Sequence, residues 1–495
     1  MPFSFTPRER GITFTVCLAA LILPLSFTAG VTALPAIAQA LPGSPLLLNG
    51  VTNGFMLLFG SLLLAAGSLA DHFGRKRLFM AGLILFFISA LACLLVPTLL
   101  WLNIARAVQG CAAAAVLAGG SASLASALAE PQRLRAFALL GSCFGIGLAL
   151  GPLLSGSLLD TLGWRGIFLL IALLALVAAI TGRRFLPESR HPAPGAVDYP
   201  GMLLFCSLLG TLIPAVMLAG QQGWQSPWVI LLLACSAALT VGFIWRERRA
   251  ASPLFALALL RHRRFLGVQL LPIATCCSFV MLLVLMPLRL MRIDGYSPLQ
   301  AALLLLALSA PLLVVPTIAV KLNQRVSAAS LCAAGLLIAT LGLVGLSFVN
   351  PHVSPLATLA ALAVIGTGSA LPWGLMDNLS VSVVPRDHAG MAVGIFSTVR
   401  VASEGVMLAI VMTLLSGLMH LHLPLSSAAM ALATGDLQLA QRQLPAFSEA
   451  TLITIYQQAF QILLWILSAV TLLAAVITAR WLQEKPQPSA ALTCS

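Results

Sequence analysis

Long runs of apolar residues, separated by short polar breaks, repeat along almost the whole chain. Each run is about as long as the roughly 20 residues that a helix needs to cross the hydrocarbon core of a bilayer. We therefore predict fourteen membrane-spanning helices, and an even number places both termini on the same side. Their approximate ranges are 11–38, 46–70, 78–98, 100–129, 134–158, 166–186, 200–220, 227–245, 266–288, 298–320, 328–348, 355–384, 390–418 and 455–481.

The basic residues test this division into spans. If the N-terminus is cytoplasmic, 21 of the 27 Lys and Arg residues fall in inside segments and four in outside segments. Cytoplasmic loops of membrane proteins carry an excess of Lys and Arg, so the bias supports both the span count and the orientation. We expect a multi-pass protein of the bacterial inner (cytoplasmic) membrane with both termini in the cytoplasm.

The composition agrees with this class of protein. The 495 residues are 60% hydrophobic and 8% charged, whereas a soluble domain is about 25% charged. The net charge of +13 reflects the topology and contact with anionic lipid. We expect the lipid bilayer and a small-molecule substrate as partners, no nucleic acid, and a monomer. His420 and His422 lack further ligands nearby, so no metal site is predicted.

The spacing of the spans divides the chain into three parts. A six-helix bundle occupies residues 1–190, and a second six-helix bundle occupies 265–495, with a periplasmic loop at 419–454. Between them, residues 191–264 hold two linker helices and a basic cytoplasmic segment. Paired halves of this kind are typical of transporters built from repeats.

Charged residues are rare inside the predicted spans, but Arg400 and Glu404 lie within the span 390–418. They are one helical turn apart, so they share a face and can partly neutralise each other. A charge at the bilayer centre costs roughly 2.5–3.5 kcal/mol on insertion scales, so such residues usually face a bundle interior or water. The two residues are either an ion pair that holds helices together or part of the path of a proton or solute.

The span 355–384 contains another acid, Asp377, beside Asn378 and one turn after Trp373. A carboxylate and an aromatic ring on one face suit an organic cation. An interior polar network with a packing tryptophan explains the same residues equally well. In the fourth span, Arg106 and Gln109 are further candidates to contact substrate, although we favour a structural role for Arg106 because buried charges usually pair internally.

The loop between the second and third spans reads G-S-L-A-D-H-F-G-R-K-R, from Gly67 to Arg77. Gly74 permits a tight turn, and Asp71 and Arg75 can form a latch on the cytoplasmic side. This pattern is too specific for an ordinary basic loop. It resembles the signature of the major facilitator superfamily.

A stretch of the fifth span strengthens this resemblance. It reads G-I-G-L-A-L-G-P-L-L-S-G-S and includes Gly147, Gly151 and Pro152. Gly147, Gly151 and Gly156 let a neighbouring helix pack closely, and Pro152 can kink the span. The stretch is similar to the antiporter motif of exporters. The L-x-x-x-R-x-x-Q-G run of the fourth span also fits, and the chain as a whole resembles the fourteen-helix drug:proton antiporter branch (quaternary-ammonium and multidrug exporters).

The resemblance implies an all-α membrane fold with two six-helix bundles, two intervening helices and a gating role for both motifs. The chain departs from the branch at Ser26, where an aspartate of the first span is usual. If transport is proton-driven, Glu404 or Asp377, with Arg400, must therefore carry the coupling. Burial and a nearby cation act in opposite directions on a carboxylate, so we predict that Glu404 exchanges a proton near neutral pH.

We therefore expect a secondary transporter, not an enzyme. It would export amphipathic or cationic small molecules by proton antiport, with the proton gradient as the energy source and no bound cofactor. The alternative is an exporter of a specific metabolite or siderophore whose coupling does not run through an acid of the first helix. The sequence has no phosphate-binding loop for ATP, no H-E-x-x-H zinc motif and no nucleophile elbow.

Overall fold

The computed structural model describes residues 5–43, 45–190, 198–250, 259, 261–349, 351, 354–384 and 389–482. The regular structure of these residues is helical. The elements are α1 (Pro7–Ala40), α2 (Pro45–Phe73), α3 (Arg75–Leu95), α4 (Leu99–Ala127), α5 (Glu130–Phe185), α6 (Tyr199–Gln222), α7 (Pro227–Arg249), α8 (Arg263–Thr275), the π-helical turn η2 (Cys276–Val280), α9 (Met281–Leu288), the π-helical turn η3 (Arg289–Ile293), α10 (Pro298–Ser309), α11 (Pro311–Leu322), α12 (Ala328–Ser347), α13 (Pro355–Trp373), α14 (Met376–Ser382), α15 (Ala389–His420), α16 (Ser426–Ala433), α17 (Leu437–Gln443) and α18 (Glu449–Trp481).

Within the described residues, thirteen helices are long and apolar enough to cross a membrane. The first limb of α5, where the fifth span is predicted, adds the shorter apolar helix Arg135–Leu148. This limb ends at Gly163, whose φ of 66° interrupts the helical geometry, and the sixth span follows. All fourteen predicted spans therefore lie on helices, with their ends moved by a few residues.

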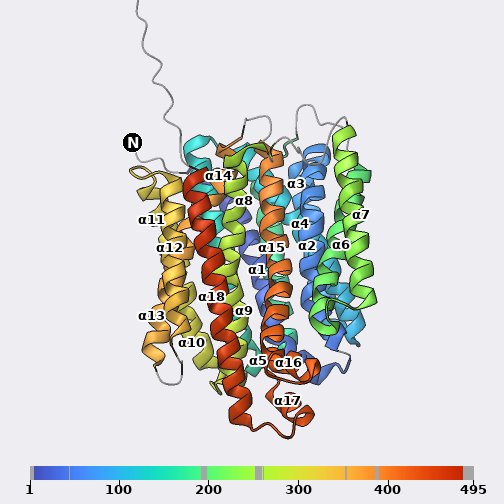
Figure 1. Cartoon of the computed structure of the whole chain (residues 1–495). Coiled ribbons are helices and arrows are strands. Elements are labelled where there is room, and N and C mark those ends of the chain that lie inside the picture. The colour runs from blue at the N-terminus through green and yellow to red at the C-terminus, as the bar shows by residue number, and fades with distance from the viewer. Residues whose placement is uncertain are drawn as a thin grey trace, which may run out of the picture.

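The spanning helices run alongside one another in a single bundle (Figure 1). The N-terminal end of α1 and the C-terminal end of α18 lie at the same end of the bundle, together with the connection between α2 and α3 (Figure 1). We call this the basic end, because Arg75, Lys76 and Arg77 begin α3 there. The short helices α16 and α17 lie at the opposite end, which we call the α16–α17 end.

Contacts between helices that are distant in sequence hold the bundle together. In the N-terminal half α1 packs along α5, and α2 packs along α4; in the C-terminal half α12 packs against α13 and α18. The two halves meet along α2 and α15, and again where α5 contacts α10 and α11. Phe55, Phe144, Phe279 and Trp373 are among the buried side chains of the core that results.

The two intervening helices pack as a pair. α6 lies along α7 and also contacts α2 and α15, so the pair flanks one of the two seams between the halves. Asp198 precedes α6 and accepts hydrogen bonds from Arg246 of α7 at 2.9 and 3.1 Å. Much of the basic segment that follows, 251–258 and 260, lies outside the described residues. The domain boundaries given above stay predictions.

The predicted outer loop 419–454 is largely helical. α15 continues to His420, and α18 already begins at Glu449. Between them α16 folds back onto the bundle and buries Ala428, Ala429 and Leu432. Gly435, with φ +81°, makes the turn between α16 and α17, a backbone conformation that glycine adopts readily.

Candidate functional site

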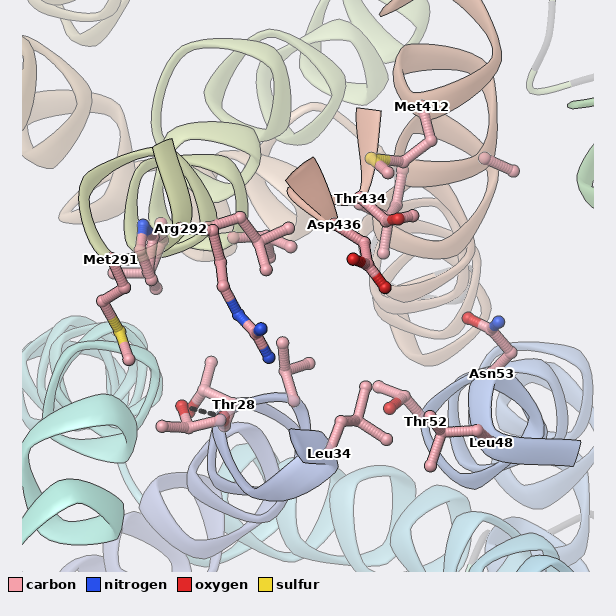
Figure 2. Close-up of a pocket in the computed structure, with 18 of the residues that line it drawn as sticks. Thr28, Leu34, Leu48, Thr52, Asn53, Met291, Arg292, Met412, Thr434 and Asp436 are labelled. Carbon is pink, nitrogen blue, oxygen red and sulfur yellow. Dashed lines mark hydrogen bonds between the residues drawn. The ribbon is translucent and has the colours of Figure 1, made fainter. Parts of the chain in front are cut away.

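A cavity of about 460 Å³ lies between the two halves of the protein. This volume falls within the usual range of small-molecule sites, about 300–1,000 Å³. Figure 2 shows that α1 and α2 face the C-terminal half across this space. The lining residues are Thr28, Val31, Thr32, Leu34, Ala38, Leu48, Thr52, Asn53, Leu283, Val284, Pro287, Leu288, Met291, Arg292, Gly405, Leu408, Ala409, Met412, Thr413, Met430, Thr434 and Asp436.

A buried ion pair joins α14 to α15. Arg400 donates through Nη1 to both carboxylate oxygens of Asp377, at 3.1 and 3.3 Å, and the two side chains are 2% and 10% exposed. The guanidinium also stacks 4.5 Å from the ring of Phe144, which belongs to α5 in the other half. On the same face of α5, a Cβ at Gly141 would meet Oδ2 of Asp377 at 2.9 Å. The pair therefore sits where the two halves touch.

Glu404 is buried one turn further along α15, with 3% of its surface exposed. Its Oε1 has no hydrogen-bond partner among the described contacts. The ion pair that the structure shows for Arg400 is the one with Asp377 rather than with Glu404. Glu404 itself does not line the cavity, although the next residue of α15, Gly405, does.

The aromatic candidate for cation binding is enclosed by other rings. Trp373 is 1% exposed, and its ring lies 6.0 Å from that of Phe144 and 6.3 Å from that of Phe279. Its Nε1 has no partner among the described contacts. Neither Trp373 nor its neighbours Asp377 and Asn378 line the cavity in this conformation. The structure thus brings Trp373, Asp377 and Arg400 together, but around Phe144 of α5 rather than around the cavity.

Arg106 ties three helices of the N-terminal half together. Its Nε donates to Val51 O at 3.0 Å, and its Nη1 donates to Ser26 Oγ at 2.9 Å and to Gln109 Oε1 at 2.6 Å. The guanidinium lies 4.3 Å from the ring of Phe55. Within the described residues no carboxylate pairs with it, and Ser26 occupies the place that an acid takes in the branch that the sequence resembles. Neither Arg106 nor Gln109 is among the residues that line the cavity.

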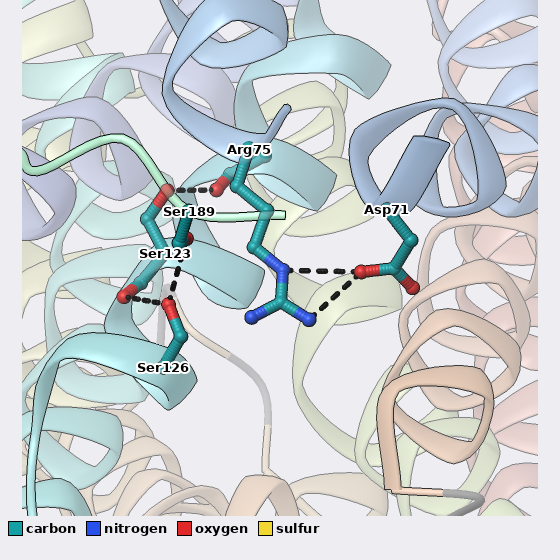
Figure 3. A network of polar contacts seen from close by, with 6 residues as sticks. Asp71, Arg75, Ser123, Ser126 and Ser189 are labelled. Atoms are coloured by element: carbon teal, nitrogen blue, oxygen red, sulfur yellow. Dashed lines mark hydrogen bonds and ion pairs between the residues drawn. The ribbon is translucent and has the colours of Figure 1, made fainter. Parts of the chain in front are cut away.

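The signature loop at the basic end forms a closed network (Figure 3). Arg75 donates to Oδ1 of Asp71 through Nε at 3.0 Å and through Nη2 at 2.8 Å. Its backbone N–H donates to Ser189 O at 3.0 Å, and Ser189 bonds to Ser126 of α4. Gly74 has a φ of +113°, which a residue with a side chain rarely adopts. All these residues belong to the N-terminal half.

The glycines of the fifth span bring α5 close to α1. A Cβ at Gly147 would collide with Leu21 O, and one at Gly151 would collide with Thr28 Oγ1. At Gly156 a Cβ would meet nothing within 4 Å, so the close packing predicted for this third glycine is wrong. The side chain of Pro152 lies outside the described residues. The close approach predicted for Gly147 and Gly151 is therefore an α1–α5 contact within one half, and their gating role stays a prediction.

Sequence reasoning missed two charged residues that line the cavity. Arg292 follows α9 in the turn η3, and Asp436 precedes α17. The sequence analysis placed both outside the spans, where a charge needs no explanation. The sequence did contain a signal at Asp436. The residue follows Gly435, and a glycine followed by an aspartate is typical of a turn that leads into a helix. Such a turn fixes the orientation of the aspartate side chain.

Comparison with known proteins now identifies the family. A family model described as Major Facilitator Superfamily matches residues 16–407. The chain is a member of the Major Facilitator Superfamily. It therefore belongs to a family of integral membrane transporters rather than to a family of enzymes.

Relatives from Mycobacterium tuberculosis and Streptomyces coelicolor match most of the chain. The multidrug resistance protein Stp of Mycobacterium tuberculosis is 33% identical over 359 residues, which are 71% of this chain and 66% of Stp. The chain thus spans just under two thirds of that protein's length. The probable actinorhodin transporter of Streptomyces coelicolor is 28% identical over 78% of this chain and 69% of the relative.

A solved structure supports the fold. The human organic anion transporter MFSD10 matches 93% of this chain and 100% of its own chain, with a TM-score of 0.54 and 16% sequence identity. At this identity the likeness concerns the fold alone. It fits the expected all-α architecture of two six-helix bundles with two further helices.

Proposed function

We propose that this superfamily member exports amphipathic or cationic small molecules by proton antiport. The observation that carries the proposal is Glu404, a buried carboxyl with an unbonded oxygen on α15, the helix whose following residues Gly405 and Leu408 line the cavity between the halves. Desolvation disfavours the charged form of a carboxyl. A conformation that lets water reach Glu404 would therefore release its proton, and the conformation described here would hold it.

The ion pair Asp377–Arg400 links proton exchange at Glu404 to the movement of the two halves. Arg400 lies on the same face of α15 as Glu404, and its guanidinium contacts Phe144 of α5 in the opposite half. When the halves move apart at this seam, the pair loses its enclosed surroundings. Arg400 would then be free to pair with Glu404 one turn away, so that proton binding and the movement of the halves depend on each other.

Relatives support the direction of transport. Stp is named a multidrug resistance protein, which fits transport out of the cell. We propose that the protein works as a monomer in the bacterial inner membrane, without a bound cofactor, and that its basic end faces the cytoplasm. Alkaline phosphatase fused after residue 481 should stay inactive, and fused within 437–443 it should be active; the reverse pattern would contradict this orientation.

The experiment that tests the function uses inside-out membrane vesicles. Cells that express the chain should yield vesicles that accumulate ethidium, a fluorescent organic cation, when respiration acidifies their lumen. An uncoupler should abolish this accumulation because it removes the proton gradient. Accumulation that is indifferent to the uncoupler would refute proton antiport.

A matched pair of substitutions assigns the coupling residue. Glu404→Gln should insert normally and lose uncoupler-sensitive accumulation, because glutamine keeps the shape of the side chain but carries no titratable proton. Glu449→Gln changes an exposed acid at the start of α18 and should transport like the unchanged protein. Full transport by Glu404→Gln would leave Glu404 a structural residue.

A specific observation favours a second candidate function. One relative is named a probable actinorhodin transporter, so export of a single metabolite is the alternative to export of many drugs. A panel of unrelated amphipathic compounds separates the two functions. Competition by many of them for ethidium transport supports a multidrug exporter, and competition by none supports a dedicated one.

A further inference from the structure

The cavity between the halves contains two opposite charges and no net charge. Among its lining residues, Arg292 is the one cation and Asp436 the one anion. Figure 2 shows both side chains reaching into the same space, Arg292 from η3 and Asp436 from the turn before α17. Both are exposed, so each keeps its contact with water and stays charged without a large desolvation cost.

The aliphatic stem of Arg292 is packed against the protein, whereas its guanidinium group extends into the cavity. Its Cβ and Cγ pack against Gly435, where a Cβ would come within 2.8 and 3.1 Å of them. The neighbouring acid, Asp294, already pairs with Arg289 at 3.3 Å. Within the described part of the chain, Arg292 has no ion-pair partner, so its guanidinium donors point into the cavity unpaired.

Asp436 is fixed by the helix that it begins. Its Oδ1 accepts a hydrogen bond from the backbone N–H of Leu439 at 2.9 Å and so caps α17. This bond orients the carboxylate, whose other oxygen faces the cavity (Figure 2). A cationic group of a ligand can approach that oxygen without disturbing the cap.

The remaining wall supplies an apolar surface and one unsatisfied hydroxyl. The apolar part includes Leu288 and Met291 from one side and Met412 from α15, and methionines adapt to ligands of different shape. Opposite them, Thr52 is 4% exposed, its Oγ1 has no partner within the described contacts, and Figure 2 shows it turned toward the cavity. A buried hydroxyl of this kind needs a hydrogen-bond partner, which a bound solute can provide.

We infer that this cavity selects amphipathic solutes that carry both an anionic and a cationic group over amphipathic solutes that are cations only. The anionic group would bind Arg292, the cationic group would bind Asp436, and the apolar body would lie against the methionine-rich wall. A solute that is only a cation gains the contact with Asp436 but meets repulsion from Arg292. The inference rests on the proposed export function and names the substrate class of the same protein.

Two dyes that differ in one group test this selectivity. Tetramethylrhodamine carries a cationic ring system and a free carboxylate, whereas its methyl ester carries the cation alone. Binding of each dye to the purified full-length chain in lipid nanodiscs is measured by fluorescence polarisation at low salt. Because both protein charges are exposed, we expect the zwitterion to bind about fivefold more tightly than the ester.

The variants separate the two charges. Arg292→Gln should weaken binding of the zwitterion and leave the ester unchanged or tighter, so that the ratio of affinities falls to about one. Asp436→Asn, which keeps a capping side chain, should weaken binding of both dyes. Arg442→Gln removes an exposed arginine of α17 that does not line the cavity, and it should change neither affinity.

Two results would overturn the inference: a tighter binding of the ester by the unchanged protein, or an affinity ratio that Arg292→Gln does not alter. Equilibrium binding uses no proton gradient, so its outcome is independent of the vesicle assay. Vesicles that pump ethidium while Arg292→Gln keeps the ratio would refute the selectivity and leave the export function standing. Vesicles that pump nothing would refute the function, whatever the dyes show.

Discussion

The buried pair Asp377–Arg400 allows a quantitative prediction about stability. Its side chains are 10% and 2% exposed, with the guanidinium 3.1 Å from the carboxylate. Exposed ion pairs contribute about 0–1 kcal/mol. Removing one partner of a buried pair costs about 3–5 kcal/mol, because the other charge stays buried without compensation. We therefore expect Asp377→Asn and Arg400→Met each to lower the free energy of unfolding by about 3–5 kcal/mol.

The double variant shows whether the loss comes from the interaction itself. With both charges removed, no uncompensated charge is left behind, so the double variant should be more stable than the sum of the single losses predicts. We expect a coupling free energy of about 2–3 kcal/mol, at the upper end of values for residues in contact. The assay is reversible unfolding in mixed micelles by titration with SDS, followed by circular dichroism.

Additive losses would refute this reasoning. If the double variant equals the sum of the singles within about 0.5 kcal/mol, the two side chains act independently. The charges of Asp377 and Arg400 would then not stabilise the contact between α14 and α15. The surroundings of Phe144 would have to be explained by apolar packing alone.

Three further predictions concern packing and charge in the N-terminal half. Gly147→Ala should lower the free energy of unfolding by about 1–3 kcal/mol, since its Cβ would collide with a backbone oxygen of α1, whereas Gly156→Ala should be nearly neutral. Ser26→Asp should raise the unfolding midpoint, because it places a carboxylate where Ser26 Oγ now accepts from Arg106 at 2.9 Å. Gly74→Ala should cost about 1–2 kcal/mol, because its φ of +113° suits glycine alone. The same SDS titration measures all four variants.

Each of these predictions has a result that contradicts it. Equal losses at Gly147 and Gly156 would mean that α1 and α5 do not pack as described. The effect of Ser26→Asp should reverse in an Arg106→Gln background, where the new acid is buried without a cation; an unchanged effect would show that Arg106 lies elsewhere. A neutral Gly74→Ala would mean that the turn between α2 and α3 has ordinary geometry.

The spans could be predicted from the sequence because crossing a bilayer is a local requirement. Twenty apolar residues in a row satisfy it wherever they lie in the fold, and the arginine bias then orients them. The same argument placed Arg400 and Glu404 in the protein interior, where the structure has them. Local pattern was thus sufficient for the elements and for the burial of their charges.

The partners of those charges could not be read from local spacing. The spacing of Arg400 and Glu404 suggested a pair. The helical geometry is interrupted between α13 and α14, however, and Asp377 of α14 pairs with Arg400 instead. Phe144 reaches the same place from α5, more than two hundred residues earlier. The cavity likewise depends on helices that are distant in sequence, so the roles of Arg292 and Asp436 became visible only in three dimensions.

The position of α6 and α7 makes the two flanks of the transporter unequal. One joint between the halves, along α2 and α15, is covered by α6. In the part of the chain that the structure describes, neither α6 nor α7 packs on the other joint, where α5 meets α10 and α11. An apolar compound that diffuses laterally in the bilayer therefore meets α6 on the α2–α15 flank, whereas on the α5–α10–α11 flank it meets the joint between the halves directly. Capture of cargo from the lipid phase should be one-sided, and bulky labels on the lipid-facing surface of α11 should hinder it more than labels on α7.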